Sequence, residues 1–335
     1  MVHTVEIDLG GRILTLETGR LAKQAHGSVL VSCGDARVLS TATSNLEPKP
    51  NVSFFPLTVD YREYFYAAGR IPGGYLKREG RMSDREILCA RMIDRPIRPL
   101  FPEGYSCDTQ VVGLVLSASP EIDPTTMAIN GASAALAVSD IPFDHILGGV
   151  RIGMVDGEYV IEPSYEQQEK SKLNIVVAGT ESGIVMVEAG ASEATEEEIL
   201  GAIEFGHECC KKIVAGIREL QSKAGKTKRV FTPPQRNAEV MAKVEAAVMD
   251  RMSDALNTKK YGKTESYALI AALKAEAVAL FTEEAEQIEA KTCFEILRER
   301  VFRKEMLDLR QRPDRRAFDE RSEERRVGKE CRSRW

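Results

Sequence analysis

The sequence predicts an α+β body followed by an all-helical domain. In the first half of the chain, apolar and polar residues alternate between glycine turns, which is typical of antiparallel hairpins. Two capping boxes, Ser83 with Glu86 and Thr195 with Glu198, predict the starts of two helices. From Asn237 to about Leu309 the chain is rich in Ala, Glu and Lys and almost lacks Gly, which predicts three or four consecutive helices.

Individual elements of the body follow from local patterns. The helix that begins at Ser83 should end near Asp94, because Pro96 disfavours helical geometry in the residue before it. The small, apolar stretch 125–139 predicts a helix packed closely on a sheet. Strands are expected at residues 5–9, 13–16, 29–31, 38–39, 54–60, 111–116, 150–155, 159–161, 173–177 and 184–187.

Composition is that of a globular protein with a sizeable core, with 43% hydrophobic and 29% charged residues. No apolar run reaches the roughly 20 residues needed to span a bilayer, so we expect no membrane association. The N-terminus lacks the pattern of a signal peptide, and the seven cysteines show neither CxxC nor zinc spacing. We therefore expect reduced thiols, no metal site and a cytoplasmic location.

The last fifteen residues, Arg321 to Trp335, differ sharply from the rest of the chain. They contain six basic and three acidic residues and resemble the translation of a sequencing adapter, so we expect an artefactual tail. The whole chain has a formal charge of −5, and without the tail the charge is −8. An acidic body with one basic stretch indicates a focused anion-binding site.

The basic stretch runs from Ala67 to Tyr105 and holds eight Arg or Lys against five Asp or Glu. Its glycines leave the backbone open to a ligand, and arginine offers phosphate a bidentate donor. A tyrosine among the cations is placed to stack on an unpaired base. The candidate residues for gripping a single strand are Arg70, Tyr75, Lys77, Arg78, Arg81, Arg95 and Arg98. The alternative is a solvated loop whose cations pair with Glu79, Asp84, Glu86 and Asp94.

No catalytic constellation stands out in the residues. The four histidines lack metal-ligand spacing, and the chain has neither a GxxxxGK[ST] motif nor a convincing GxGxxG motif. Without further information the sequence predicts an α+β protein that binds a phosphate-rich polymer.

Three motifs resemble bacterial and organellar polynucleotide phosphorylase. They are EIDLGGRILTLETGRLAKQAHGSV near the N-terminus, DYREYFYAAGRIPGGYLKREGRMSDREILCARMIDRPIRPLFPEGY at 60–105, and VEAGASEATEEEILGAIEFGHE at 187–208. The resemblance covers about residues 3–320 and implies an RNase-PH-like core with the βαβ layers of ribosomal S5 domain 2. It implies a first core at 1–222, a linker at 223–236, an all-α domain at 237–310 and the start of a second core at 311–320, before the tail at 321–335. Arg315 stands where the family usually has Gly.

The resemblance also implies an activity for the complete protein. Family members are homotrimeric 3′–5′ exoribonucleases of mRNA turnover that use phosphate to release nucleoside diphosphates, in a reversible reaction. The Mg²⁺ ligands and the phosphate cradle belong to the second core, so this fragment is expected to contain no catalytic residue and no metal ligand. Single-stranded RNA is the expected partner, together with other copies of the chain and RNA-degradosome components.

Two departures from an active core predict that the first core is catalytically silent. Asn174 stands where an active core would be expected to have the Asp of an Asp-x-Lys group, with Val176 in place of the Lys. Asp123-Pro124-Thr125 replaces a Ser run, and an Asp there would repel phosphate. The resemblance places Tyr75, Leu76, Lys77 and Arg78 in the loop that lines the RNA aperture of the ring. The alternative is a non-catalytic RNA-binding ring subunit of RNase PH or exosome type, although exosome-type chains lack a helical domain after the core.

Overall fold

The computed structural model describes residues 1–49, 52, 54–233 and 235–320, so the expected tail lies outside the described residues. The chain forms two compact units, one from Met1 to Pro233 and one from Pro234 onward. None of the helices in the described ranges is both long and apolar enough to cross a bilayer. The α+β class with a helical C-terminal region is confirmed.

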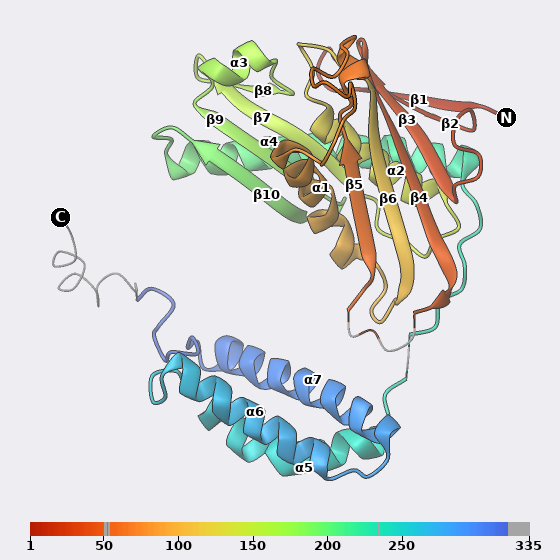
Figure 1. The fold of residues 1–335 in the computed structure, drawn as a ribbon. Coiled ribbons are helices and arrows are strands. Elements are labelled where there is room, and N and C mark those ends of the chain that lie inside the picture. Colours follow the sequence, from red (N-terminus) through yellow and green to blue (C-terminus); the bar gives the residue numbers. More distant parts are fainter. Residues whose placement is uncertain (50–51, 53, 234, 321–335) are drawn as a thin grey trace. The chain divides into compact units, whose positions relative to one another are not determined.

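Six strands of the first unit form one mixed sheet in the order β1-β2-β3-β4-β6-β5 (Figure 1). Neighbouring strands are antiparallel except β5 and β6, which run parallel. The parallel pair brings the segments that follow β5 and β6 to the same edge of the sheet. The strands are β1 (His3–Asp8), β2 (Ile13–Thr18), β3 (Gly27–Cys33), β4 (Ala36–Pro48), β5 (Leu57–Arg62) and β6 (Cys107–Ser117).

A second, four-stranded sheet is antiparallel throughout and has the order β10-β9-β7-β8. Its strands are β7 (Gly148–Val155), β8 (Glu158–Ile161), β9 (Leu173–Gly179) and β10 (Ile184–Ala191). The helix α4 (Glu196–Ala224) packs on β7 and β9 and also reaches β1 of the first sheet.

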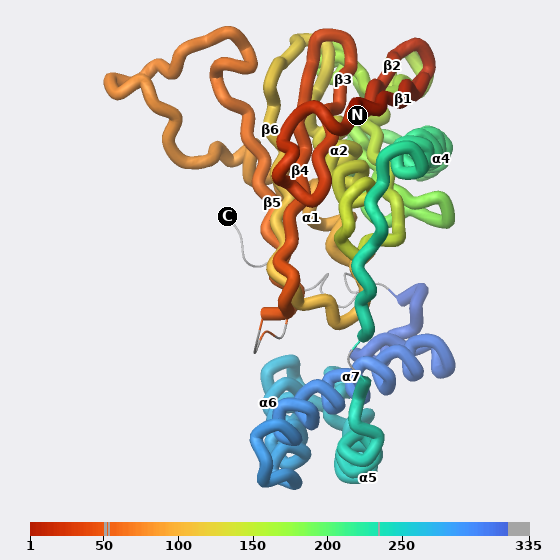
Figure 2. The backbone as a smooth tube through the Cα atoms, turned by 90° about the vertical axis from the view of Figure 1, so that its right-hand side faces the viewer, coloured from red at the N-terminus to blue at the C-terminus, as the bar shows by residue number. Residues whose placement is uncertain are grey.

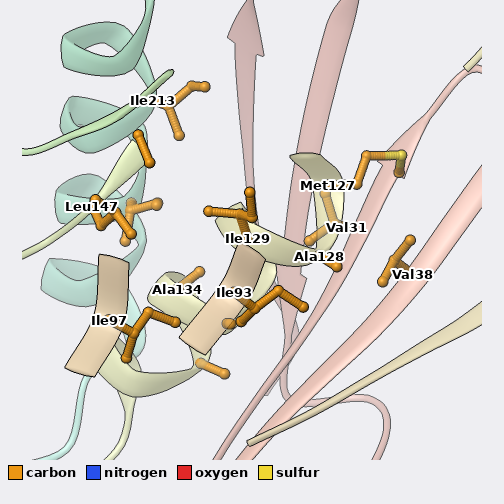
Figure 3. Packing of buried hydrophobic residues seen from close by; sticks show 14 of the residues in the cluster. Val31, Val38, Ile93, Ile97, Met127, Ala128, Ile129, Ala134, Leu147 and Ile213 are labelled. Atoms are coloured by element: carbon orange, nitrogen blue, oxygen red, sulfur yellow. The ribbon is translucent and has the colours of Figure 1, made fainter. Parts of the chain in front are cut away.

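Helix α2 (Pro124–Val138) joins the two sheets, and every one of its 15 residues is buried. It packs against β3 and β4 on the first sheet and against β7 on the second. Figure 3 shows Ile129 and Ala134 of α2 among buried side chains of strands and helices from both halves of the unit. Gly131 permits this approach, because a Cβ there would lie 2.3 Å from the Ser40 hydroxyl oxygen. The closely packed helix expected at 125–139 is therefore confirmed.

Helix α1 (Asp84–Ile97) begins with the expected capping box at Ser83 but does not end at Asp94. Pro96 lies inside the helix, which continues into the 3₁₀ turn η2 (Arg98–Leu100). The Arg98 backbone N–H still donates to the Asp94 carbonyl, and the two side chains pair at 2.6 Å. These bonds across the proline compensate for the missing N–H, so the expected end was three residues too early.

Two further differences concern the body of the first unit. The strand expected from Phe54 begins only at Leu57, because the turn at Pro56 bonds the Leu57 N–H back to the Phe55 carbonyl. The short helix α3 (Tyr165–Lys170) was not expected. Its capping box, Ser164 with Gln167, is the signal that would have predicted it.

In its described residues the second unit has three helices, α5 (Ala238–Ala255), α6 (Lys263–Ala279) and α7 (Glu284–Asp308). Apolar side chains of all three form a separate core, in which Val244, Val248, Phe294 and Leu297 are completely buried. The Ala-, Glu- and Lys-rich composition with few glycines, which predicted three or four helices, agrees with the three helices of the described residues.

Candidate functional site

The basic loop, residues Gly69–Met82, leaves the sheet edge between the 3₁₀ turn η1 (Phe65–Ala68) and α1. It extends away from the body of the unit (Figure 2, orange). Both of its ends are fixed. The Ala118 N–H after β6 donates to the Ala67 carbonyl at 2.9 Å, and the Phe65 N–H donates to the Glu79 carboxylate at 2.9 Å. Gly69 ends η1 in the left-handed conformation, with φ 67°.

The four cations of the loop, Arg70, Lys77, Arg78 and Arg81, are exposed. Within the described ranges no carboxylate lies within 4.0 Å of any of them, in contrast to the ion pairs of neighbouring arginines. Three of the four carboxylates of the alternative interpretation have other partners. Glu79 binds the Phe65 N–H, while Glu86 pairs with Arg62 and Asp94 with Arg98. The loop therefore presents cations that are available to an anion.

Large apolar side chains accompany these cations. Tyr75 is 99% exposed, Leu76 is 74% exposed and Ile71 is 77% exposed. The tip of the basic loop is a turn in which the Lys77 N–H donates to the Gly74 carbonyl, and Lys77 adopts a positive φ of 50°. A fully exposed ring between cations can stack on a base while the cations meet the neighbouring phosphates.

The two remaining candidates, Arg95 and Arg98, lie at the end of α1 and already have partners. Arg98 pairs with Asp94 and donates to the carbonyls of Phe55 and Leu57 at 2.9 and 3.1 Å. Arg95 pairs with Glu188 of β10. The structure therefore separates the candidates into five exposed loop residues and two arginines engaged within the protein.

The N-terminal end of α2 has a buried ion pair where an anion would otherwise bind. The Asp123 carboxylate caps the helix by accepting from the Thr125 N–H at 3.0 Å and from its hydroxyl at 2.7 Å. Arg151 pairs with the same carboxylate at 2.9 Å, and Arg85 lies 3.4 Å from it. Asp123 is only 6% exposed. The start of α2 thus carries the negative charge of a buried carboxylate that caps the helix and pairs with Arg151.

Arg151 also contacts Asn174, the other residue that departs from an active core, because its guanidinium donates to the Asn174 side-chain oxygen. Glu162 completes the cluster by accepting from the Arg151 N–H at 3.0 Å and the Thr126 hydroxyl at 2.9 Å. Burial raises the pKa of Glu162 to about 7. Sequence reasoning missed Arg151 and Glu162, and no local pattern marks either residue.

A second basic segment, here called the strap, covers Lys226 to Phe231 within the expected linker. Lys226 donates to the His26 carbonyl at 2.6 Å, and Lys228 donates to the carbonyls of Leu136 and Ser139 near the end of α2. Arg229 pairs with Asp140 through two hydrogen bonds, of 2.9 and 3.2 Å. Its other bonds reach the carbonyls of Ser44 and Asn45, and the Phe231 ring packs edge-on against Tyr105. Every cation of the strap is engaged by the first unit.

Six cysteines lie in the described ranges, and all six are buried free thiols. This agrees with the expectation of reduced thiols.

Comparison with known proteins covers both units. Residues 10–142 match the family model of the 3′ exoribonuclease family, domain 1, and residues 145–209 match domain 2 of the same family. Residues 239–317 match the model described as polyribonucleotide nucleotidyltransferase, RNA binding domain.

Curated relatives carry the same family name. The polyribonucleotide nucleotidyltransferase of Solibacter usitatus is 58% identical over 320 residues, which are 96% of this chain and 46% of the relative. That of Acidobacterium capsulatum is 54% identical over 321 residues, which are 95% of this chain and 40% of the relative. The chain thus spans less than half the length of these relatives. Among solved structures, rice (Oryza sativa) Rrp46 aligns with a TM-score of 0.50 at 16% identity, over 66% of this chain and 94% of that one, and supports the fold alone.

Proposed function

The chain belongs to the polyribonucleotide nucleotidyltransferase family, and we propose that it is the part that binds and guides single-stranded RNA rather than the part that cuts it. The observation that carries this proposal is the basic loop. Four of its cations have no carboxylate partner among the described residues, and Tyr75 beside them is 99% exposed. Cations alternating with an exposed ring suit a strand with unpaired bases.

The proposed activity of the complete protein is 3′–5′ phosphorolysis of RNA, in which phosphate attacks the terminal linkage and a nucleoside diphosphate leaves. Phosphate is the co-substrate, Mg²⁺ is bound in a second core, and three copies form the ring in the cytoplasm, where RNA-degradosome proteins are further partners. Within this chain we assign residues 1–222 to the first core, 223–236 to the linker, 237–310 to the all-α domain and 311–320 to the start of the second core.

Catalytic silence of the first core is part of the proposal, and the cluster at α2 supports it. The Asp123 carboxylate accepts from the Thr125 N–H at the helix end and pairs with Arg151, and its negative charge would repel a phosphate there. A divalent cation does not fit beside Asn174 either, because the Arg151 guanidinium contacts the amide oxygen and would repel the ion.

Binding of a fluorescent oligoribonucleotide tests the loop. Lys77→Ala with Arg78→Ala should weaken binding about tenfold or more and reduce the slope of log K against log salt by about 1.4, since each phosphate contact contributes roughly 0.7. The matched control is Arg218→Ala with Lys223→Ala, which removes two exposed cations of α4 that already have carboxylate partners. Equal effects of the two double variants would contradict a role for the loop.

Product analysis tests the silent core. The chain incubated with RNA, phosphate and Mg²⁺ should release no nucleoside diphosphate, while the salt-dependent binding persists. Formation of nucleoside diphosphates by this chain would overturn the assignment of Asp123, Arg151 and Asn174 to a closed site.

A further inference from the structure

A pocket of about 230 Å³ lies at the root of the basic loop. It forms there because the parallel strands β5 and β6 end at the same sheet edge, and the hydrogen bond from Ala118 to Ala67 joins the segments that follow them. Its walls come from η1, the end of β6, the start of α2 and α3. The lining residues include Tyr64, Phe65, Ala68, Arg70, Ser119 and Tyr165.

The walls combine aromatic surface with one cation. Tyr64, Phe65 and Tyr165 contribute rings, and Phe65 is 48% exposed. Arg70 is exposed and has no carboxylate partner in the described part of the chain. The volume is smaller than that of typical pockets for drug-sized molecules, roughly 300–1,000 Å³, and suits a single planar ring system. An unstacked base in contact with aromatic walls is the usual form of single-strand recognition.

Glu63 adds a directional acceptor to the pocket. Its Oε1 accepts from the Tyr61 hydroxyl at 2.6 Å and lies 3.4 Å from the Arg85 Nε. Within the described ranges no hydrogen bond reaches Oε2. A carboxylate oxygen accepts from the exocyclic amino group of adenine, cytosine or guanine. Arg70 attracts a phosphate at the rim of the pocket.

We propose that this pocket holds one unstacked nucleobase of the bound RNA strand and that Glu63 favours bases with an exocyclic amino group. The inference rests on the proposed function, because the basic loop supplies the strand. It adds a second base-binding position that is separate from Tyr75, since Tyr75 does not line the pocket.

An abasic scan locates the base. Oligoadenylates with a single abasic nucleotide at successive positions are titrated against the chain by fluorescence anisotropy. One position should lose about tenfold in affinity, the loss expected for one stacked base. Ala68→Phe places a ring in the pocket and should abolish that position-specific loss, while Tyr75→Ala should abolish a loss at a different position. The matched control Ala275→Phe adds the same ring on the exposed face of α6 and should change neither position.

Base identity provides an independent measurement that does not require Ala68→Phe to fold. Replacing adenine by uracil at the sensitive position should weaken binding several-fold in the unaltered chain, and Glu63→Gln should reduce this preference. Salt-dependent RNA binding without any position that responds to Ala68→Phe, or without a base preference that responds to Glu63→Gln, would overturn the pocket assignment and leave the proposed function intact. Absence of salt-dependent RNA binding would overturn both.

Discussion

The basic loop and the strap contain the same cationic residue types, but the cations of the strap bind groups of the same unit and those of the loop are exposed. In the strap, Lys226, Lys228 and Arg229 donate to carbonyls and to Asp140 of the same unit. In the loop, Lys77 and Arg78 are exposed, and no carboxylate of the described residues pairs with either. The comparison shows that a count of Lys and Arg does not distinguish a ligand site from a structural clamp. The two are distinguished by whether the donors already have hydrogen-bond partners within the protein, because a donor with such partners has little to gain from RNA.

The largest expected effect is on the strap. Arg229→Ala removes the double hydrogen bond to Asp140 and leaves that half-buried carboxylate without its cation. The free energy of unfolding should fall by about 3 kcal/mol, in the range for hydrogen bonds between charged groups. Urea denaturation of the first unit measures it. If the free energy of unfolding fell by less than about 0.5 kcal/mol, the strap would contribute little to the stability of the first unit.

The buried cluster at α2, which includes Glu162, should make the free energy of unfolding depend on pH. Because burial raises the pKa of Glu162 to about 7, the folded state holds this proton more tightly than the unfolded state does. The stabilisation is present at low pH and is lost as the pH rises through 7, by about 2 kcal/mol between pH 5 and 7. Glu162→Gln cannot titrate and should remove this part of the pH dependence.

The control for Glu162 is Glu193→Gln. Glu193 has a positive φ of 52°, like Glu162 with 47°, but Glu193 is exposed. Its substitution should leave the pH profile of the unfolding free energy unchanged. If the unfolding free energy of Glu162→Gln depended on pH in the same way as that of the unaltered chain, the raised pKa of Glu162 would be contradicted.

A smaller effect is expected at Arg315 in the helical unit. Arg315 has a positive φ of 61° and pairs with the Glu305 carboxylate at 3.1 Å, so it is saturated like the strap. Arg315→Ala and Arg315→Gly both lose the ion pair, but only glycine is free of left-handed strain. The glycine variant should therefore be more stable than the alanine variant by about 1 kcal/mol. Equal stabilities in thermal denaturation would contradict this conformation.

The smallest effect on stability belongs to the loop. Lys77→Ala with Arg78→Ala removes no contact with a carboxylate, so the free energy of unfolding should change by less than about 0.5 kcal/mol. The same pair should weaken RNA binding strongly. A large loss of stability would show that the loop cations have structural partners and would end the contrast with the strap.

Much of the fold follows from local signals. Alternation and glycine turns predict the hairpins, and the boxes at Ser83 and Thr195 locate the starts of α1 and α4. These signals suffice because a helix start or a turn involves bonds among neighbouring residues. One error lies where bonds between distant residues contribute: α1 continues past Pro96 into a segment where Arg98 donates to the carbonyls of Phe55 and Leu57, about forty residues away along the chain.

The sequence by itself determined the α+β order, the family and the presence of a basic loop before Ser83. Tertiary structure alone decided which cations lack a carboxylate partner among the described residues. Arg98 and Arg229 look no different in the sequence from Arg78, but carbonyls and carboxylates distant along the chain surround them. The pocket beneath the loop likewise depends on the parallel pairing of β5 with β6, which joins segments about fifty residues apart. Hydrogen-bond saturation is a property of the space around a side chain, and residue type does not reveal it.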